Sequence, residues 1–382
     1  MTGLRSIAAC AAPYRGAQLC DVRRLAEMLP GLDEGVLLHA GPPYEGRPAP
    51  APVRNAAAQA LLFEGAAADF EEALRLLDGD EYFLAPAQDY GVVTPLAQVV
   101  SASMPVLVVG DEERLVCAPV VEGPPPALRF GSPDAQCLAA LRAHASMALR
   151  ELGPALREHP VDVADVVAQA LAAGDECHSR TAAANQALID RLDGIADDYH
   201  ALLAANPGFV LPVIMAASAW ALAGSSSIES VGGNGLAFGV RLSGAATWRT
   251  APAQPPQGTR LPGAAQAQAL GAIGDSAVID FCGLGGQALH YAPTLVEEWR
   301  DRLPPDWAAR AGMLVDPANG TVSAARIAAS GMAPIVHLAM VGATPAGGIV
   351  GRGFYLPPVD IFAAEAAGST APGTACGTGG AR

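Results

Sequence analysis

The chain has 382 residues, of which 51% are hydrophobic and only 16% are charged. This composition supplies material for large cores and excludes disorder throughout, because disorder requires low hydrophobicity and high charge. The formal net charge of −15 repels phosphate backbones and anionic lipid surfaces, so we expect neither nucleic-acid nor membrane partners. By length, the chain holds about two or three domains.

Lysine is absent, and all 23 basic residues are arginine. Schiff-base chemistry, pyridoxal-phosphate linkage and the P-loop lysine are therefore excluded. Any anionic substrate has to be bound by arginine forks, helix N-termini or backbone amides. We expect no cofactor.

The cysteines argue against a disulfide framework, since the seven of them are scattered, odd in number and form no C-x-x-C pair. A zinc ribbon is improbable for the same reason. The first twenty residues lack the apolar core of a signal peptide, and the longest apolar run is shorter than the roughly 20 residues of a membrane span. We expect a reducing, cytoplasmic setting.

The first part of the chain, 1–125, alternates predicted helices with buried strands. The helices are expected at 21–30, 55–65 and 69–80, and the strands at 35–39, 103–111 and 114–123. This alternation predicts an N-terminal α/β domain. The Pro- and Gly-rich stretch EGPPPALRFGSPD, 122–134, is the best candidate for a linker.

A mainly helical domain is predicted for 130–224. Asp134 is a plausible cap for the first of its helices, and apolar residues then recur about every third or fourth position. The segment 181–207 reads as one long amphipathic helix or a pair, and 210–224 is apolar all round, as in a buried helix.

The pattern changes again in 225–366. Residues 227–252 show strand-like alternation punctuated by glycine, 252–268 reads as a loop, and 273–289 reads as a strand, a glycine turn and a helix start. A helix is expected at 294–303, and the low-complexity tail 367–382 is expected to be disordered. The fold class is therefore multi-domain α+β, with a glycine-rich C-terminal α+β unit.

The stretch GDECHSR, 174–180, concentrates titratable groups in a region poor in charge. In a helix, Asp175 and His178 are i and i+3, so the carboxylate would orient the imidazole as a general base. Glu176 and Arg180 are i and i+4, so Glu176 would hold the guanidinium toward an anion. The alternative is structural, with Asp175 capping the next helix. No metal is expected, because Glu-Cys-His has no second ligand cluster.

Two glycine-rich stretches are candidates for anion binding. In GGNGLAFGVRLSG, 232–244, backbone amides near Asn234 and Gly235 would form a nest, with Arg241 and Ser243 on one face of a strand. The alternative is a set of tight turns with a solvent-facing arginine.

The second stretch, IGDSAVIDFCGLGGQA, spans 273–288 and contains four candidate residues, Asp275, Ser276, Gly285 and Gly286. It fails the G-x-G-x-x-G fingerprint of dinucleotide-binding loops. Cys282 is either a nucleophile beside a glycine turn or, more commonly for a lone cysteine in an apolar run, part of the core.

Several segments together resemble one bacterial family, the YlbE/YahG-like proteins, long catalogued as a domain of unknown function. The similar segments are LLHAGPP, EEALRLL, PLAQVVSASMPVLVV, GDECHSR, GGNGLAFGVRLSG and IGDSAVIDFCGLGG, in the family's order over roughly residues 30–365. The resemblance implies an α+β protein with an inserted helical unit and association with FdrA-type partner proteins. One branch is linked to oxamate carbamoyltransferase in allantoin and purine nitrogen degradation.

The resemblance makes a carbamoyltransferase, or a subunit of one, our first hypothesis. The small anionic substrate would be oxamate or oxalurate with carbamoyl phosphate or phosphate. His178, oriented by Asp175, would move the proton of the amide nitrogen, while Arg180 or Arg241 would bind phosphate or carboxylate. Glycine-loop amides would stabilise the oxyanion. Alternatives are an amide or ring hydrolase using Asp175, Glu176 and His178, and a non-catalytic assembly subunit. We expect a homo-oligomer.

Overall fold

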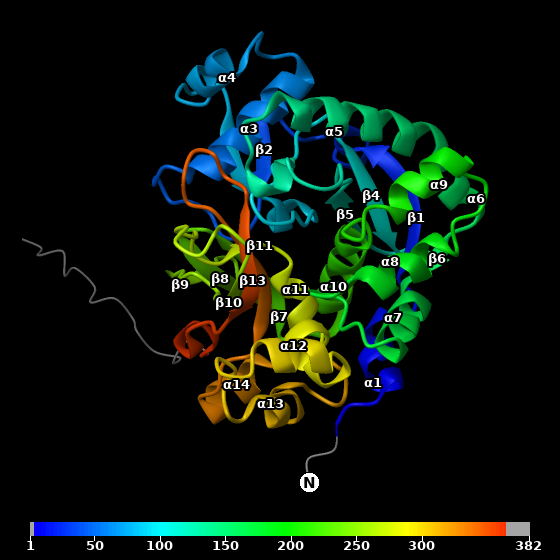
Figure 1. Ribbon diagram of the computed structural model, residues 1–382, viewed down its shortest axis with the longest axis vertical. Coiled ribbons are helices and arrows are strands. Elements are labelled where there is room, and N and C mark those ends of the chain that lie inside the picture. The colour runs from blue at the N-terminus through cyan, green and yellow to red at the C-terminus, as the bar shows by residue number, and fades with distance from the viewer. Residues whose placement is uncertain (1–3, 364–382) are drawn as a thin grey trace, which may run out of the picture.

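The computed structural model describes residues 4–363 and confirms the predicted α+β fold (Figure 1). One antiparallel sheet has the strand order β5-β4-β1-β6, and a parallel pair, β2-β3, lies apart from it. The strands are β1 (Gln18–Arg24), β2 (Val36–His39), β3 (Phe83–Pro86), β4 (Pro105–Gly110), β5 (Leu115–Pro119) and β6 (Val161–Asp162). The domain boundaries proposed above stay a prediction.

The later part of the chain contributes two further antiparallel sheets, with strand orders β11-β7-β8-β9 and β10-β13-β12. Their strands are β7 (Ile228–Asn234), β8 (Ala237–Leu242), β9 (Arg249–Pro252), β10 (Gln257–Arg260), β11 (Ile273–Gly274), β12 (Val336–Val341) and β13 (Ile349–Tyr355). β10 lies in the segment 252–268, which the sequence predicts as a loop.

Helices cover these sheets on several sides (Figure 1). The α-helices are α1 (Ile7–Ala11), α2 (Leu25–Met28), α3 (Ala51–Glu64), α4 (Phe70–Leu76), α5 (Ala135–Met147), α6 (Gly153–Glu158), α7 (Val163–Ala172), α8 (Ala182–Ile189), α9 (Asp197–Ala204), α10 (Val210–Ser225), α11 (Ala277–Phe281), α12 (Pro293–Glu298), α13 (Trp307–Leu314) and α14 (Ala324–Ser330). A π-helical turn, Ala148–Leu152, joins α5 to α6.

Short 3-10 turns occupy the connections between these elements. They are η1 (Ala12–Tyr14), η2 (Ala87–Tyr90), η3 (Leu128–Phe130), η5 (Gly285–Gln287), η6 (Leu289–Tyr291) and η7 (Val359–Phe362). The predicted tail, 367–382, lies outside the described residues.

Two predicted elements are wrong in type. Residues 21–24, expected to be helical, belong to β1, because their backbone pairs with β4 and only 25–28 forms a helical turn. The apolar run after Asp275, expected to be a strand, forms the short helix α11. An apolar run of this length does not distinguish a strand from a buried helix by periodicity. The segment 181–207 is a helix pair, α8 and α9.

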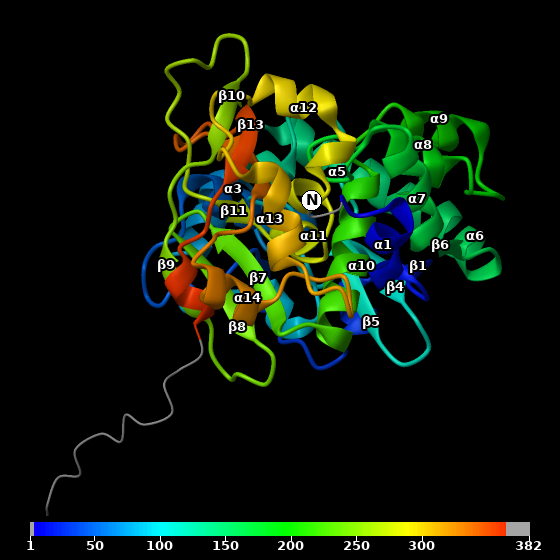
Figure 2. The same cartoon turned by 90° about the horizontal axis from the view of Figure 1, so that it is seen from below.

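The central element is α10, whose all-apolar sequence is buried as predicted. It packs against β4 and β5 on one side and against β7 and α11 on the other, so it joins the early sheet to the later ones. Seen from below, α10 lies between α11 and the β4–β5 hairpin (Figure 2). This packing fixes α11, which carries a buried acid of the site described next.

Candidate functional site

The segment 174–181 links α7 to α8 and is not helical. Cys177 has a φ of 69°, a left-handed conformation that removes the i, i+3 geometry on which the sequence prediction relied. Asp175 Oδ2 accepts hydrogen bonds from the backbone N–H groups of Ala183 and Ala184 at 2.8 and 3.2 Å. Burial raises the pKa of Asp175 to about 6. Asp175 therefore caps α8, and its predicted pairing with His178 is wrong.

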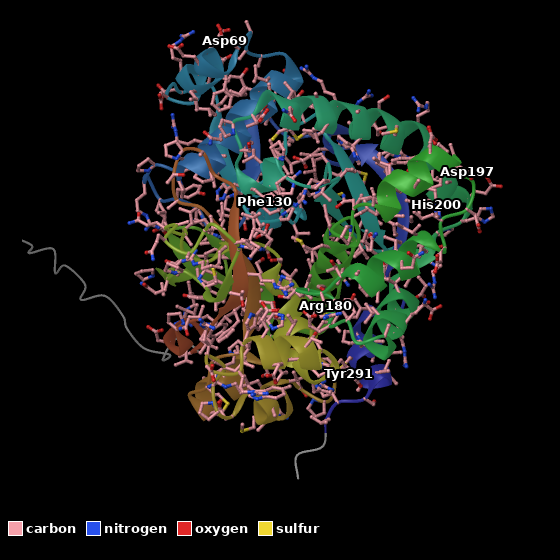
Figure 3. All side chains as sticks on the ribbon, in the orientation of Figure 1. Asp69, Phe130, Arg180, Asp197, His200 and Tyr291 are labelled. Carbon is pink, nitrogen blue, oxygen red and sulfur yellow. The ribbon has the colours of Figure 1, made fainter. Side chains whose placement is uncertain are left out.

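Glu176 is fully buried, and its carboxylate binds backbone N–H groups of the same segment, 174–181. Its carboxylate accepts N–H bonds from Ser179 and Arg180, and its Oε1 lies 3.0 Å from Nδ1 of His337. Burial alone would raise the pKa of Glu176, but the hydrogen bond and charge interaction with His337 outweigh it and lower the pKa. The predicted Glu176–Arg180 side-chain pair is wrong, since the guanidinium of the exposed Arg180 (Figure 3) donates to the hydroxyl of Thr294 in α12.

His178 is oriented by Asp280 of α11, which lies 102 residues further along the chain. Its Nδ1 is 2.8 Å from Oδ2 of Asp280, and both side chains are almost completely buried. The other oxygen of Asp280 accepts the backbone N–H groups of Gly286 and His337. Because a carboxylate on Nδ1 fixes the tautomer, Nε2 is the ring nitrogen left to act on a bound molecule.

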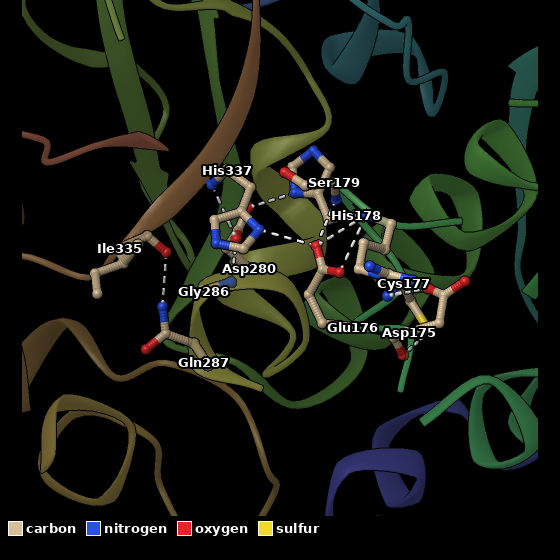
Figure 4. Close-up of polar contacts among 11 residues, drawn as sticks. Asp175, Glu176, Cys177, His178, Ser179, Asp280, Gly286, Gln287, Ile335 and His337 are labelled. Atoms are coloured by element: carbon tan, nitrogen blue, oxygen red, sulfur yellow. Dashed lines mark hydrogen bonds and ion pairs between the residues drawn. The ribbon is translucent and has the colours of Figure 1, made fainter. Parts of the chain in front are cut away.

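Two histidine–carboxylate pairs thus lie side by side, His178 with Asp280 and His337 with Glu176 (Figure 4). The two rings are 6.0 Å apart, and the edge of Trp299 lies against His337. The His337–Glu176 pair is fully buried, so it stabilises the site without reaching solvent.

The sequence analysis missed Asp280 and His337. Each stands in an apolar run, AVIDF and IVHLAM, where a titratable side chain has to find a buried partner. A titratable residue within an apolar run could have indicated a site residue, but it does not identify the partner of Asp280 or of His337.

The glycine loop after α11 contacts both histidine–carboxylate pairs through its backbone amides. The N–H of Gly285 donates to the carbonyl of Glu176, and the N–H of Gly286 donates to Asp280. A Cβ at Gly286 would lie 2.1 Å from the carbonyl oxygen of Ile335, so only glycine fits there. Both amides are occupied, which contradicts their predicted role as anion or oxyanion donors.

A pocket of about 460 Å³ lies at His178. Its wall includes Ser276, Arg260 and the ion pair of Arg352 with Glu298. The Nη1 atom of Arg260 is buried and has no hydrogen-bond partner among the described residues. The pocket therefore offers one imidazole nitrogen and one uncompensated guanidinium to a small anion.

The GGNG stretch lies elsewhere in the fold. Asn234 caps its own turn by accepting the N–H groups at 236 and 237, and Gly235 takes a φ of 88° there. Arg241 pairs with Asp89 and Glu229, and Ser243 is exposed beyond the end of β8. None of these residues lines the pocket at His178, so the structure does not place Arg241 where it could bind an anion on which His178 acts.

Asp275 is fully buried and does not line the pocket at His178. Its carboxylate accepts N–H bonds from Gly41 and Thr94 and a side-chain bond from Gln88. It therefore fixes the loop 94–96, part of which lines the pocket beside Ser276. Both of its oxygens are occupied by protein donors and it does not line the pocket, so the predicted anion-binding role of Asp275 is contradicted.

The described residues, 4–363, contain no group of three or more His, Cys, Asp and Glu side chains suited to hold a metal ion. Within the same residues, no helix is long and apolar enough to cross a membrane.

Fold and site together define an α+β protein with a carboxylate-oriented histidine at the wall of an arginine-containing pocket. Residues 83–276, about half of the chain, match the family model of oxamate carbamoyltransferase subunit AllG. The chain is 35% identical to the oxamate carbamoyltransferase subunit AllG of Escherichia coli over 299 residues, covering 72% of this chain and 70% of that protein. The chain belongs to this family.

Two further similarities support the assignment. The uncharacterized protein YahG of Escherichia coli is 29% identical over 378 residues, covering 88% of this chain and 79% of YahG. A crystal structure of a conserved protein of unknown function from Enterococcus faecalis superposes with a TM-score of 0.80 at 26% identity, covering 93% and 94% of the two chains. The resemblance seen in the sequence motifs is thereby confirmed, and the family is that of a subunit, which implies partner proteins.

Proposed function

We propose that the chain acts in an oxamate-carbamoyltransferase-type complex and that the pocket at His178 binds the small anionic amide. The observation that carries this proposal is the combination of an oriented imidazole with an uncompensated arginine at one pocket. His178 is held by Asp280, and Arg260 has a buried Nη1 without a partner. Family membership supplies the reaction class.

The proposed chemistry assigns one task to each group. Arg260 binds the carboxylate of oxamate or oxalurate, because a guanidinium fork matches a carboxylate. In phosphorolysis, phosphate attacks the carbamoyl carbon of oxalurate, and the bond from that carbon to the amide nitrogen breaks. His178 Nε2 accepts a proton from the attacking phosphate and then delivers it to the departing nitrogen, giving oxamate and carbamoyl phosphate. Asp280 acts through His178 and is a positioning residue.

The test is phosphorolysis of oxalurate by the purified chain, alone and with an FdrA-type partner, measured as carbamoyl phosphate formed. We expect His178→Gln to lower kcat by about 100-fold or more with KM little changed, as for loss of a general acid–base group. Arg260→Met should raise KM by about tenfold or more. His159→Gln and Arg302→Met, at exposed positions, are the matched controls.

Two results would contradict the proposal. Absence of carbamoyl phosphate in both assays would remove the specific reaction. Full partner-dependent activity in both pocket variants would leave the chain as an assembly subunit, which was the alternative from the sequence.

A further inference from the structure

A second and larger pocket, of about 720 Å³, lies away from His178 between the N-terminal segment, α10 and the loop before α14. Three arginines line it, namely Arg5, Arg114 and Arg326, against the single acidic residue Asp316. This is a local excess of positive charge in a chain whose net charge is −15. Arginines elsewhere in the chain, such as Arg23, Arg157 and Arg352, pair with carboxylates, so this group of arginines requires an explanation.

None of the three guanidinium groups forms an ion pair with a carboxylate of the described residues. Arg5 donates to the carbonyl oxygens of residues 9, 283 and 320, and Arg326 donates to that of Met313. One carboxylate oxygen of Asp316, Oδ1, accepts a hydrogen bond from the backbone N–H of Ala318. Carbonyl oxygens hold Arg5 and Arg326 in position but do not neutralise their positive charge, whereas Arg114 has a charge interaction with the carboxylate of Asp111.

Arg114 is the most informative of the three. Its guanidinium carbon lies 5.2 Å from the ring centre of Trp220, and its buried Nε has no hydrogen-bond partner within residues 4–363. Gly224 makes room for it, because a Cβ at that position would lie 2.6 Å from Nη2 of Arg114. Stacking on Trp220 and the space at Gly224 therefore fix the guanidinium at the pocket wall.

We propose that this pocket is a binding site for a phosphorylated small molecule. Guanidinium forks match phosphate oxygens, and a chain without lysine has only arginine to supply that charge. The volume exceeds the needs of one phosphate and falls in the range of organic ligands. Pro13, Ala221 and Val315 provide apolar wall for the organic part. This site does not depend on the function proposed for the pocket at His178.

The test is calorimetric titration of the full chain with pyrophosphate, with ADP and with citrate. We expect saturable binding of pyrophosphate and ADP, tighter than that of citrate. Arg114→Met and Arg326→Met should each raise Kd by about tenfold or more, since each removes a charged hydrogen-bond donor. Arg302→Met, which removes an exposed arginine outside the pocket, should leave Kd unchanged.

Further variants separate this site from the pocket at His178 and from loss of folding. Arg260→Met should leave pyrophosphate binding intact, and Gly224→Ala should weaken it by displacing Arg114 without removing a charge. Circular dichroism verifies that each variant is folded. The proposal is overturned by absence of saturable binding, by Kd values in Arg114→Met and Arg326→Met that equal that of wild type, by loss of binding only in Arg260→Met, or by citrate binding more tightly than pyrophosphate.

Discussion

Asp275 gives a quantitative test of the interior beside the candidate site. Its carboxylate is fully buried, and burial raises its pKa from 3.8 to about 7, although four hydrogen bonds from three residues act in the opposite direction. The change we propose is Asp275→Asn, which keeps the shape of the side chain and removes its titration.

The sign follows from proton linkage. Between pH 4 and pH 7 the folded chain binds a proton at Asp275 that the unfolded chain has released, so the free energy of unfolding falls as the pH rises. Each pKa unit corresponds to about 1.4 kcal/mol, so wild type should lose about 4 kcal/mol relative to Asp275→Asn over this interval. The contribution is fully present below pH 4 and is lost above pH 7.

The assay is urea unfolding of both proteins at several values between pH 4 and pH 8. The difference between their free energies of unfolding isolates this one carboxyl, because Asp175, whose pKa is also raised, is present in both proteins. A difference that does not change with pH would refute the reasoning. If the free energy of unfolding of wild type instead rose relative to that of Asp275→Asn as the pH rises, the four hydrogen bonds would be holding the carboxylate ionised.

Two further predictions concern the loops that shape the site. Asp175→Ala removes the acceptor for two N–H groups of α8 and should lower the free energy of unfolding by about 1–3 kcal/mol in urea, whereas Asp193→Ala, at an exposed position, should change it little. Gly286→Ala places a Cβ against the carbonyl of Ile335 and should cost about 1–3 kcal/mol, with Gly31→Ala, where a Cβ meets nothing, as the control. Equal stability of variant and control would contradict either prediction.

Local chemistry made a good part of the fold predictable. The Asp69 and Asp134 caps and the buried α10 follow from residue type and spacing, because caps and apolar faces act over one or two helical turns. The strand at 21–24 was missed because its conformation is set by pairing with β4, more than eighty residues away in the sequence. Tertiary pairing of this kind overrides local helix propensity.

The same distinction explains the site. The sequence identified His178 but paired it with the nearest acid, on the assumption that 174–180 is helical. The left-handed residue Cys177 breaks that register and frees Asp175 to cap α8. The true partner, Asp280, is fixed by packing between α10 and α11, which no spacing rule contains.

The hydrogen bond to Asp280 orients the imidazole of His178, which Asp175, as the cap of α8, does not contact. Asp280 accepts a hydrogen bond from Nδ1–H of His178, so Nε2 is left as the basic atom at the pocket wall. His337, whose Nδ1 is likewise bonded to a carboxylate, is fully buried and lacks access to the pocket. Of two histidines with the same type of partner, only His178 can therefore exchange a proton with a bound substrate, and His337 and Glu176 serve to hold the segment that carries it.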